Sequence, residues 1–296
     1  MAERGISRRV VERIEGIAAR LAFAFFELLP IDAASAVGGW LARTIGPHLG
    51  ISKRARDNLR RSLPGIAETE IARIVRGMWD NLGRVVAEYP HLDELEIGAP
   101  GRRVESRGVD EILAGAASKT RYIFFSAHCG NWEIALLATK QYGLDVVGIY
   151  RAANNPFVDR LMAEARSVIG IELVPKGATA AKRALGALNE GKHLCMLVDQ
   201  KMNDGIAVPF FGRDAMTAPA LARLALRHDC VVVPVRVERL TGARFRLTAE
   251  APLPLPRSGD LQADTLALMS AVNATVERWV RARPEHWLWL HRRWPD

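Results

Sequence analysis

The spacing of apolar positions changes partway along the chain, near residue 120. Before this point apolar residues recur at helical intervals, and within residues 68–89 they are Ile71, Ile74, Val75, Met78, Leu82, Val85, Val86 and Tyr89. This spacing predicts an amphipathic helix with one face in the core. Residues 6–46 contain two further helical stretches that are separated at Pro30, and Asp32 is a candidate N-cap of the second. The first 110 or so residues are therefore predicted to be helical.

Beyond residue 120, short apolar runs alternate with helical patterns. The apolar runs are RYIFFSA, DVVGIY, IELVP, HLCMLV, VVVPVRVE and FRLTAE, and the helical stretches between them include 156–169, 178–190 and 217–228. Such alternation predicts βαβ units and a largely parallel sheet flanked by helices. The continuous apolar runs suit strands that are covered on both faces. We therefore expect N-terminal helices in residues 1–50 and an α/β domain in residues 51–296.

The composition narrows the class of protein without choosing a function. The 296 residues are 49% hydrophobic and 25% charged, which is typical of a globular chain with one large core. The three cysteines are far apart and form no C-x-x-C pair, so neither a disulfide framework nor a zinc cluster is expected. The net charge of +8 favours anionic partners, namely nucleic acid, anionic lipid headgroups or an acidic carrier protein.

The N-terminal segment combines basic and apolar residues. Arg4, Arg8, Arg9 and Arg13 precede the run IAARLAFAFFELLPI, which Arg20 and Glu27 interrupt. This run is shorter than the roughly 20 apolar residues of a spanning helix, and no signal-peptide cleavage site is clear. We expect a helix that lies in the membrane interface, and the alternative is a helix packed on the core. The basic run at 52–65 is either a solvated helix face or a site for an anionic partner.

The candidate chemistry lies in the stretch FFSAHCGNWEIALLATK, residues 124–140. His128 follows a predicted strand at 122–127, and ligands of open α/β sheets bind beyond the carboxyl ends of strands. Glu133 comes five residues later, which places the two side chains about 140° apart on a continuous helix. The chain must therefore turn between them if they are to meet. Gly130 permits such a turn, Asn131 is a candidate N-cap, and a helix N-terminus favours ionised Glu133.

A carboxylate bonded to one imidazole nitrogen would fix the tautomer and leave the other nitrogen as a base. The pattern implies no Ser or Cys nucleophile, so the base would act on a hydroxyl of the substrate. Cys129 adjoins His128, but adjacent side chains project apart, and a Cys–His pair is the weaker hypothesis. The alternative without chemistry is that His128 ends a strand and Glu133 serves only the helix terminus.

The His-x4-Glu pattern resembles the His-x4-Asp/Glu signature of the glycerolipid acyltransferase superfamily. Its context HCGNWE, together with four later blocks, resembles more specifically the late acyltransferases of lipid A biosynthesis. The later blocks are GIYRAANNP, VDQKMNDGIAVPFFGR, VVVPVRVER and the ending PEHWLWLHRRW, and the whole set spans residues 128–294. Where other superfamily members have a Pro-Glu-Gly phosphate loop, this chain has Asp199-Gln200-Lys201. That departure favours the lipid A branch over a glycerol-3-phosphate acyltransferase.

The resemblance implies a role for six residues. His128 would be the general base and Glu133 its partner, Arg151 would hold an acceptor phosphate, and Asp199 would be a third functional polar residue. Asn131 and Gln200 would line the site. The implied reaction moves an acyl chain from acyl carrier protein to a hydroxyl of a Kdo-bearing lipid A precursor, an anionic lipid. It needs no cofactor and no metal, and it takes place on the cytoplasmic face of the cell inner membrane.

Several alternatives remain open on the sequence. The acceptor could be another membrane lipid, such as a phosphatidylinositol mannoside or a lysophospholipid, with acyl-CoA as the donor. A nucleic-acid-binding module is disfavoured because no helix-turn-helix, RNA-recognition or zinc-finger pattern is present, and a serine hydrolase because no G-x-S-x-G is present. The tail WLWLHRRW either lies at the membrane interface or packs on the domain through Trp287, Trp289 and Trp294, and packing is favoured.

Overall fold

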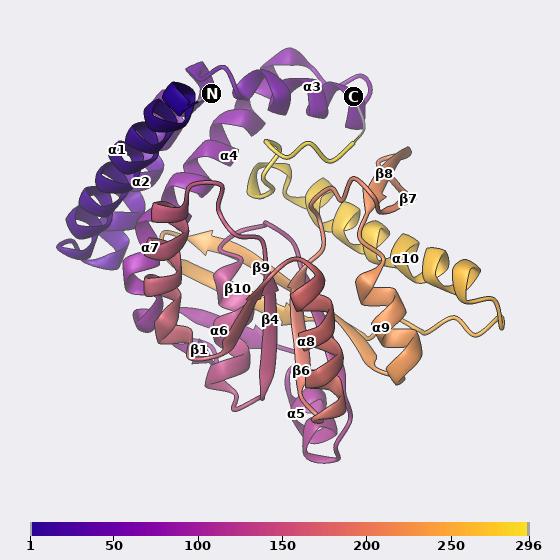
Figure 1. Cartoon of the computed structure of the whole chain (residues 1–296). Helices are drawn as coiled ribbons and strands as arrows, with labels where there is room; N and C mark the ends of the chain where they lie inside the picture. The colour runs from indigo at the N-terminus through magenta and orange to yellow at the C-terminus, as the bar shows by residue number, and fades with distance from the viewer. Residues whose placement is uncertain (1, 295–296) are drawn as a thin grey trace.

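The computed structural model describes residues 2–294, with side chains from residue 9 onward except at Ala178. The predicted α/β architecture is confirmed, with helices on both faces of a largely parallel sheet (Figure 1). The sheet order is β1-β2-β10-β9-β3-β6-β4-β5, and within the described part of this sheet only β9 and β10 pair antiparallel. The strands are β1 (Ile97–Gly98), β2 (Val104–Arg107), β3 (Tyr122–Ser126), β4 (Val146–Tyr150), β5 (Glu172–Pro175), β6 (His193–Leu197), β9 (Val231–Thr241) and β10 (Arg244–Ala249). A separate hairpin consists of β7 (Ile206–Phe210) and β8 (Arg213–Thr217).

Two apolar cores cover the two faces of the sheet. Phe125 belongs to one core and Phe124 to the other, because successive strand residues point to opposite faces. Residues of α4 (Glu68–Glu88), α8 (Ala178–Asn189), α9 (Ala220–His228) and α10 (Leu261–Ala282) fill the first core, with part of α3 (Ser52–Ser62). Residues of α5 (Asp110–Ala117) and α6 (Glu133–Gln141), with some from α7 (Pro156–Arg166), fill the second.

The N-terminal helices are α1 (Ala2–Glu27) and α2 (Ile31–Ile45), and the predicted break at Pro30 is confirmed. The predicted N-cap role of Asp32 is wrong, because Asp32 lies inside α2 and accepts hydrogen bonds from Arg103 and the Ala243 N–H instead. Gly38 of α2 meets Gly83 of α4 so closely that a Cβ at Gly38 would lie 2.5 Å from the Gly83 carbonyl oxygen. The side chains of Arg4 and Arg8 lie outside the described residues.

Among the helices in the described part of the chain, none combines the length and apolar character that a membrane crossing needs. The basic run at 52–65 forms α3, which buries Ala55 and Leu59. Arg54 and Asn58 of this helix donate hydrogen bonds to backbone carbonyls of the C-terminal segment. Part of this basic run therefore serves packing. The helix expected at 217–228 begins only at Ala220, because residues 213–217 form β8.

The C-terminal segment, residues 284–294, packs on the domain. Trp287 and Trp289 are fully buried and Trp294 nearly so, which confirms the packed interpretation of this tail. The Leu288 N–H donates to the His128 carbonyl at 3.2 Å, and the Gly130 N–H donates to the His286 carbonyl at 3.2 Å. The C-terminal segment is therefore hydrogen-bonded to the turn that carries His128, and Figure 1 shows it running close to α3.

Candidate active site

A tight turn after β3 places His128 just beyond the carboxyl end of the strand, as predicted. Gly130 within this turn has φ +57°, and a Cβ there would lie 2.7 Å from the Val237 carbonyl oxygen. Both the backbone conformation and the lack of space therefore call for glycine. Helix α6 starts at Glu133, and the Glu133 N–H donates to the Asn131 side-chain oxygen at 3.2 Å. The N-cap position of α6 is Trp132 and not Asn131 as expected, but Asn131, one residue earlier, still accepts this hydrogen bond from the first turn.

The carboxylate that holds the His128 imidazole belongs to Asp199. Nδ1 of His128 lies 2.8 Å from Oδ1 of Asp199, and Oδ2 accepts from the His128 backbone N–H at 2.9 Å and from the Trp287 indole N–H at 2.7 Å. Burial alone would raise the pKa of Asp199, but the neighbouring His128 and its hydrogen bonds hold that pKa well below its usual range. Asp199 is therefore an ionised carboxylate, and Nδ1 of His128 donates to it.

Strand order explains this pairing. β3 and β6 are parallel neighbours in the sheet, with Ser126 opposite Leu197. Because the carboxyl ends of parallel neighbours lie at the same edge, the residues that follow both strands meet there. His128 and Asp199 each come two residues after their strand ends. The carboxylate therefore reaches the base across the sheet, from 71 residues further along the chain.

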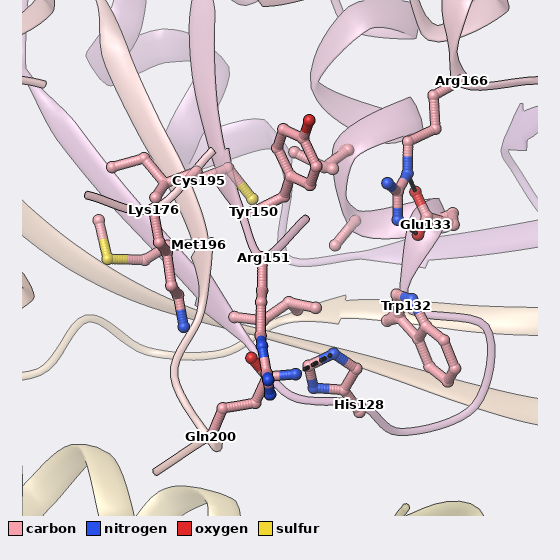
Figure 2. Close-up of a pocket in the computed structure, with 14 residues that line it drawn as sticks. His128, Trp132, Glu133, Tyr150, Arg151, Arg166, Lys176, Cys195, Met196 and Gln200 are labelled. Atoms are coloured by element: carbon pink, nitrogen blue, oxygen red, sulfur yellow. Dashed lines mark hydrogen bonds and ion pairs between the residues drawn. The ribbon is translucent and has the colours of Figure 1, made fainter. Parts of the chain in front are cut away.

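Glu133 is held elsewhere, so the predicted hydrogen bond between Glu133 and His128 is wrong. Arg166 donates from Nε to Oε2 of Glu133 at 2.8 Å and from Nη2 to Oε1 at 2.6 Å, and the Tyr89 hydroxyl donates to Oε1 at 2.5 Å. Burial would lower the pKa of Arg166, but the Glu133 carboxylate raises it above its usual value. The start of α6 directs Glu133 toward α7, while the Trp132 ring lies beside His128 (Figure 2).

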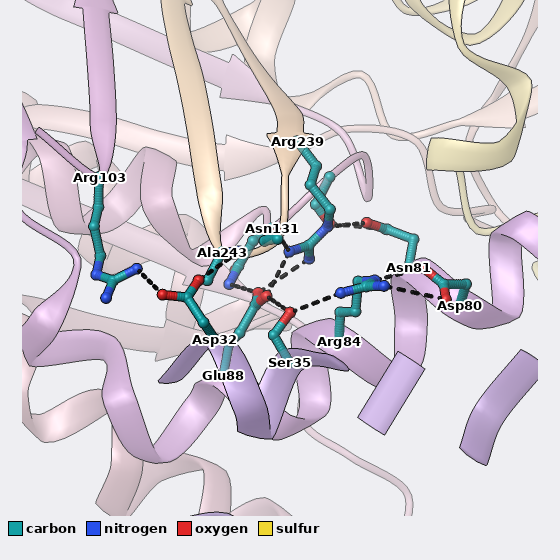
Figure 3. A network of polar contacts seen from close by, with 12 residues as sticks. Asp32, Ser35, Asp80, Asn81, Arg84, Glu88, Arg103, Asn131, Arg239 and Ala243 are labelled. Carbon is teal, nitrogen blue, oxygen red and sulfur yellow. Dashed lines mark hydrogen bonds and ion pairs between the residues drawn. The ribbon is translucent and has the colours of Figure 1, made fainter. Parts of the chain in front are cut away.

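A buried polar network lies behind the turn and includes Asn131 (Figure 3). Glu88 of α4 accepts from Asn131 at 2.9 Å, from the Ser35 hydroxyl at 2.7 Å and from both terminal nitrogens of Arg239. Asn81 accepts from Nε of Arg239 at 3.0 Å and donates to the Gly130 carbonyl at 2.9 Å. Asn131 is fully buried here and does not line the cleft, contrary to the expectation that it lines the site. The network joins α2, α4 and β9 to the turn.

The cleft in front of His128 has a polar end and an apolar wall. Nε2 of Gln200 lies 3.4 Å from Nε2 of His128, and Arg151 follows the end of β4 at the same side (Figure 2). Gln200 and Arg151 thus both line the cleft, and the phosphate contact expected of Arg151 stays a prediction. The apolar wall consists of Trp132, Ala135, Leu136, Ile149, Cys195, Met196 and Leu197. This arrangement suits a substrate with a reacting polar group and a hydrocarbon chain.

The structure adds site residues that sequence reasoning missed. They are Arg166 and Tyr89 on Glu133, Trp287 on Asp199, and His291, whose ring lies edge-on to His128 with centroids 4.8 Å apart. Burial and the neighbouring His128 lower the pKa of His291 to about 3, so its imidazole is neutral. The motif WLWLHRRW was visible in the sequence, but nothing local to it indicates contact with residue 128.

His128, Asp199 and His291 also bring possible metal ligands together, all within 4.8 Å of one another. Donor atoms around a tetrahedral zinc, with Zn–N of about 2.1 Å, are separated by roughly 3.4 Å. Binding a zinc ion through these atoms would therefore require the three groups to rearrange and the hydrogen bond between His128 and Asp199 at 2.8 Å to break. The observed arrangement is that of a base held by a carboxylate.

Comparison with known proteins decides the family. The family of bacterial lipid A biosynthesis acyltransferases matches residues 8–296. The chain belongs to this family. Among curated relatives, the lipid A biosynthesis myristoyltransferase of Escherichia coli (strain K12) is 26% identical over 250 residues, which cover 82% of this chain and 75% of the relative.

Two further relatives agree with this assignment. The lipid A biosynthesis lauroyltransferase of the same strain is 25% identical over 256 residues, covering 82% of this chain and 78% of the relative. A lipid A biosynthesis acyltransferase of Haemophilus influenzae is 23% identical over 245 residues, covering 80% and 73%. As a member of this family, the chain is an enzyme that transfers acyl groups.

Proposed function

We propose that this acyltransferase moves a fatty acyl chain from acyl carrier protein to a hydroxyl of a Kdo-bearing lipid A precursor. The hydrogen bond between His128 and Asp199 at the polar end of an apolar cleft is the observation that carries this proposal. Family membership supports the lipid acceptor. The net charge of +8 suits both an acidic carrier protein and an anionic lipid.

The proposed mechanism has no covalent acyl-enzyme. In the neutral imidazole, a proton on Nδ1 that is donated to Asp199 leaves Nε2 free to act as the base, and Nε2 lies beside Gln200 at the cleft. Nε2 takes the proton from the acceptor hydroxyl as the oxygen attacks the thioester carbonyl. The tetrahedral intermediate then collapses, the carbon–sulfur bond breaks, and the thiolate receives the proton from His128. Base catalysis of this kind contributes about 10²- to 10⁴-fold to the rate.

Asp199 and Glu133 have different roles in this mechanism. Asp199 contacts the imidazole and stabilises the imidazolium that forms after proton transfer. Glu133 instead joins α6, α7 and Tyr89, so it acts as a positioning residue that holds one wall of the cleft. The pair that carries the proposed mechanism is therefore His128 with Asp199, and Glu133 has a supporting role.

We further propose that residues 1–50 attach the enzyme to the inner membrane from the cytoplasmic side. One stripe of α1 exposes Val10, Ile14, Ile17, Leu21 and Phe25, with exposed fractions of 49–67%, and Leu28 just beyond the helix is 84% exposed. Trp40, Leu41 and Ile45 of α2 are also exposed, and Arg9 and Arg13 of α1 are exposed near the stripe. Large exposed apolar surfaces mark interaction sites, and adjoining arginines favour anionic headgroups. This geometry suits a helix that lies in the membrane interface.

Acyl transfer from radiolabelled acyl carrier protein to the Kdo-bearing precursor tests the proposal directly. We expect activity in the native enzyme and losses of at least about 100-fold in folded His128→Ala and Asp199→Asn variants. Parallel reactions with acyl-CoA, with a lysophospholipid and with a phosphatidylinositol mannoside separate the rival donors and acceptors. Transfer only to another lipid would remove the lipid A assignment and keep the base. Full activity of His128→Ala would refute the mechanism.

A further inference from the structure

A second cavity lies against the turn that carries His128 and is separate from the reaction cleft. It has a volume of about 440 Å³ and is enclosed by residues of α2, α4, β9 and the short 3₁₀ turn Pro284–His286. Among the described residues, none lines both this cavity and the cleft. Sites for small molecules typically have volumes of about 300–1,000 Å³. The cavity is therefore large enough for a small polar ligand.

Positive charge predominates in the lining of this cavity. Four arginines and two carboxylates contribute to it, namely Arg43, Arg73, Arg76, Arg239, Asp80 and Glu285. Asp80 accepts from Arg43 at 2.9 Å and also from Arg84 at 2.5 Å, so one carboxylate serves two arginines. The carboxylates of the lining thus do not balance its arginines.

Arg76 is the arginine best placed to receive a ligand. It is exposed, and its side chain has no hydrogen bond or ion pair with another described residue. Arg73 lies three residues earlier on the same face of α4, bonded to Glu70 at 2.7 Å and only loosely paired with Glu285 at 3.7 Å. Arg43 uses one N–H of its Nη1 for Asp80, which leaves its other donors for a ligand.

His286 reports the positive character of the cavity independently. Burial and three neighbouring arginines lower the pKa of His286 to about 4, although Glu285 opposes them. The imidazole is therefore neutral near pH 7 and adds no charge to the lining. An anion in this cavity would be attracted by the same arginines that disfavour the imidazolium.

The cavity also adjoins the catalytic turn through its own lining. Asn81 donates to the Gly130 carbonyl at 2.9 Å, and the His286 carbonyl accepts from the Gly130 N–H at 3.2 Å. Asn81 and Arg239 belong to the polar network of Figure 3. A ligand bound here would contact residues that hold the turn, so its binding should raise the unfolding temperature.

Arg43 connects the cavity with the surface that we propose contacts the membrane. Trp40, three residues earlier on α2, is 54% exposed, and residues three apart are neighbours on a helix surface. Tryptophan side chains favour the headgroup level of a bilayer, where lipid phosphates also lie. The cavity therefore lies near a source of phosphate groups.

We propose that this cavity binds the phosphate group of a phosphate ester, as a second anion site apart from the reaction cleft. The planar guanidinium of Arg76 donates to two phosphate oxygens, and the remaining donors of Arg43 reach the same group. Two sources carry this chemistry, namely the headgroup of a membrane phospholipid and a soluble phosphate ester.

The test compares variants that are all built on Arg151→Gln, so that the phosphate contact expected at the cleft does not contribute. The test variants are Arg76→Gln and Arg76→Lys. The matched control is Arg223→Gln, which removes an exposed arginine of α9 that also has no side-chain partner among the described residues. One probe is glycerol phosphate, measured by thermal unfolding. The other is flotation with vesicles of phosphatidylcholine, alone or mixed with phosphatidylglycerol.

We expect Arg76→Gln to weaken binding of a phosphate-bearing probe by about 10-fold, in keeping with the loss of one charge-assisted hydrogen bond. Arg223→Gln should stay within about twofold of the parent protein. Arg76→Lys keeps the charge but loses the two-pronged donor geometry, so it should weaken binding by at least about threefold. Diffuse attraction to an anionic surface depends on charge alone and would leave Arg76→Lys equal to the parent.

The two probes identify the source of the phosphate. An effect of Arg76→Gln on flotation with phosphatidylglycerol alone identifies the lipid headgroup, and an effect on glycerol phosphate alone identifies a soluble ester. Effects on both show a phosphate site that accepts either source. Equal binding by Arg76→Gln and Arg223→Gln with both probes, or by Arg76→Lys and the parent, would overturn the proposal. Neither measurement uses acyl transfer, so the result does not depend on the proposed reaction.

Discussion

Replacing Trp287 by Phe removes one hydrogen-bond donor from Asp199 and leaves an aromatic ring in the same buried place. The indole N–H donates to Oδ2 at 2.7 Å, while Nδ1 of His128 uses Oδ1. Together with the His128 backbone N–H on the same oxygen, the indole bond holds the rotation of the carboxylate that orients the base. Hydrogen bonds to charged groups are worth about 1.5–3 kcal/mol, so the Trp287→Phe change should raise the pKa of Asp199.

This change still leaves Asp199 ionised at neutral pH, because its pKa begins well below the usual range. The rate should therefore fall through misorientation of His128 and not through protonation of Asp199. We expect kcat to decrease by about 10-fold, which corresponds to about 1.4 kcal/mol, with KM changed by less than about twofold. Acyl transfer measured under saturating donor and acceptor gives both constants.

Trp289 supplies the matched control. It is as fully buried as Trp287, and its indole N–H donates at 2.8 Å to the Pro284 carbonyl instead of a carboxylate. Trp289→Phe should lower the thermal unfolding temperature about as much as Trp287→Phe does, while its kcat stays within about twofold of the native value. If both variants lose the same kcat in proportion to their loss of stability, Trp287 has only a packing role and the reasoning is refuted.

Four further outcomes are expected. Gly130→Ala should abolish activity, since φ is +57° and a Cβ meets a carbonyl oxygen, and circular dichroism shows whether the fold persists. The pKa of His291 is lowered from 6.5 to about 3, so between these pH values the unfolded chain binds a proton that the folded chain does not. This difference makes the free energy of unfolding decrease by about 1.4 kcal/mol for each pH unit of acidification, and His291→Gln should make that decrease smaller. Leu21→Glu, at a residue 67% exposed, should weaken flotation with anionic vesicles and leave the unfolding temperature unchanged. Glu133→Gln should destabilise the fold by about 3–5 kcal/mol by leaving Arg166 buried and unpaired, and adding Arg166→Met should restore part of that loss in a double-mutant cycle of urea unfolding.

The sheet could be predicted because its signals are local. Continuous apolar runs predicted the buried strands at 122–127 and 193–198, and the structure has β3 and β6 there. Helix boundaries were less secure where another element intervened, as at β8 before α9. Asp32 had the residue type of an N-cap, but Arg103 and the Ala243 N–H compete for its carboxylate from other parts of the chain. At Asp32, tertiary contacts therefore outweigh the local preference of aspartate for the N-cap position.

The candidate site likewise has some features that the local sequence predicts and others that depend on the fold. The position of His128 after a strand is a local feature, and the turn through Gly130 was predicted from residue type. The partner of His128 was not predictable from local pattern, because it depends on β3 lying beside β6 in the sheet. Closeness in sequence favoured Glu133, and the structure pairs Glu133 with Arg166 from α7. Asp199 was named as a functional residue through resemblance alone.

Glu133 and Asp199 show how the donors around a carboxylate determine its role. Glu133 faces a permanent cation, Arg166, so its charge is neutralised whatever happens in the cleft. Within the described part of the chain, the donors to Asp199 besides the imidazole are neutral, namely the Trp287 indole and a backbone N–H. Its charge is therefore free to stabilise a proton that arrives on His128, which a carboxylate already paired with arginine would do less well. The difference in partners, more than the distance in sequence, makes Asp199 the carboxylate suited to the base.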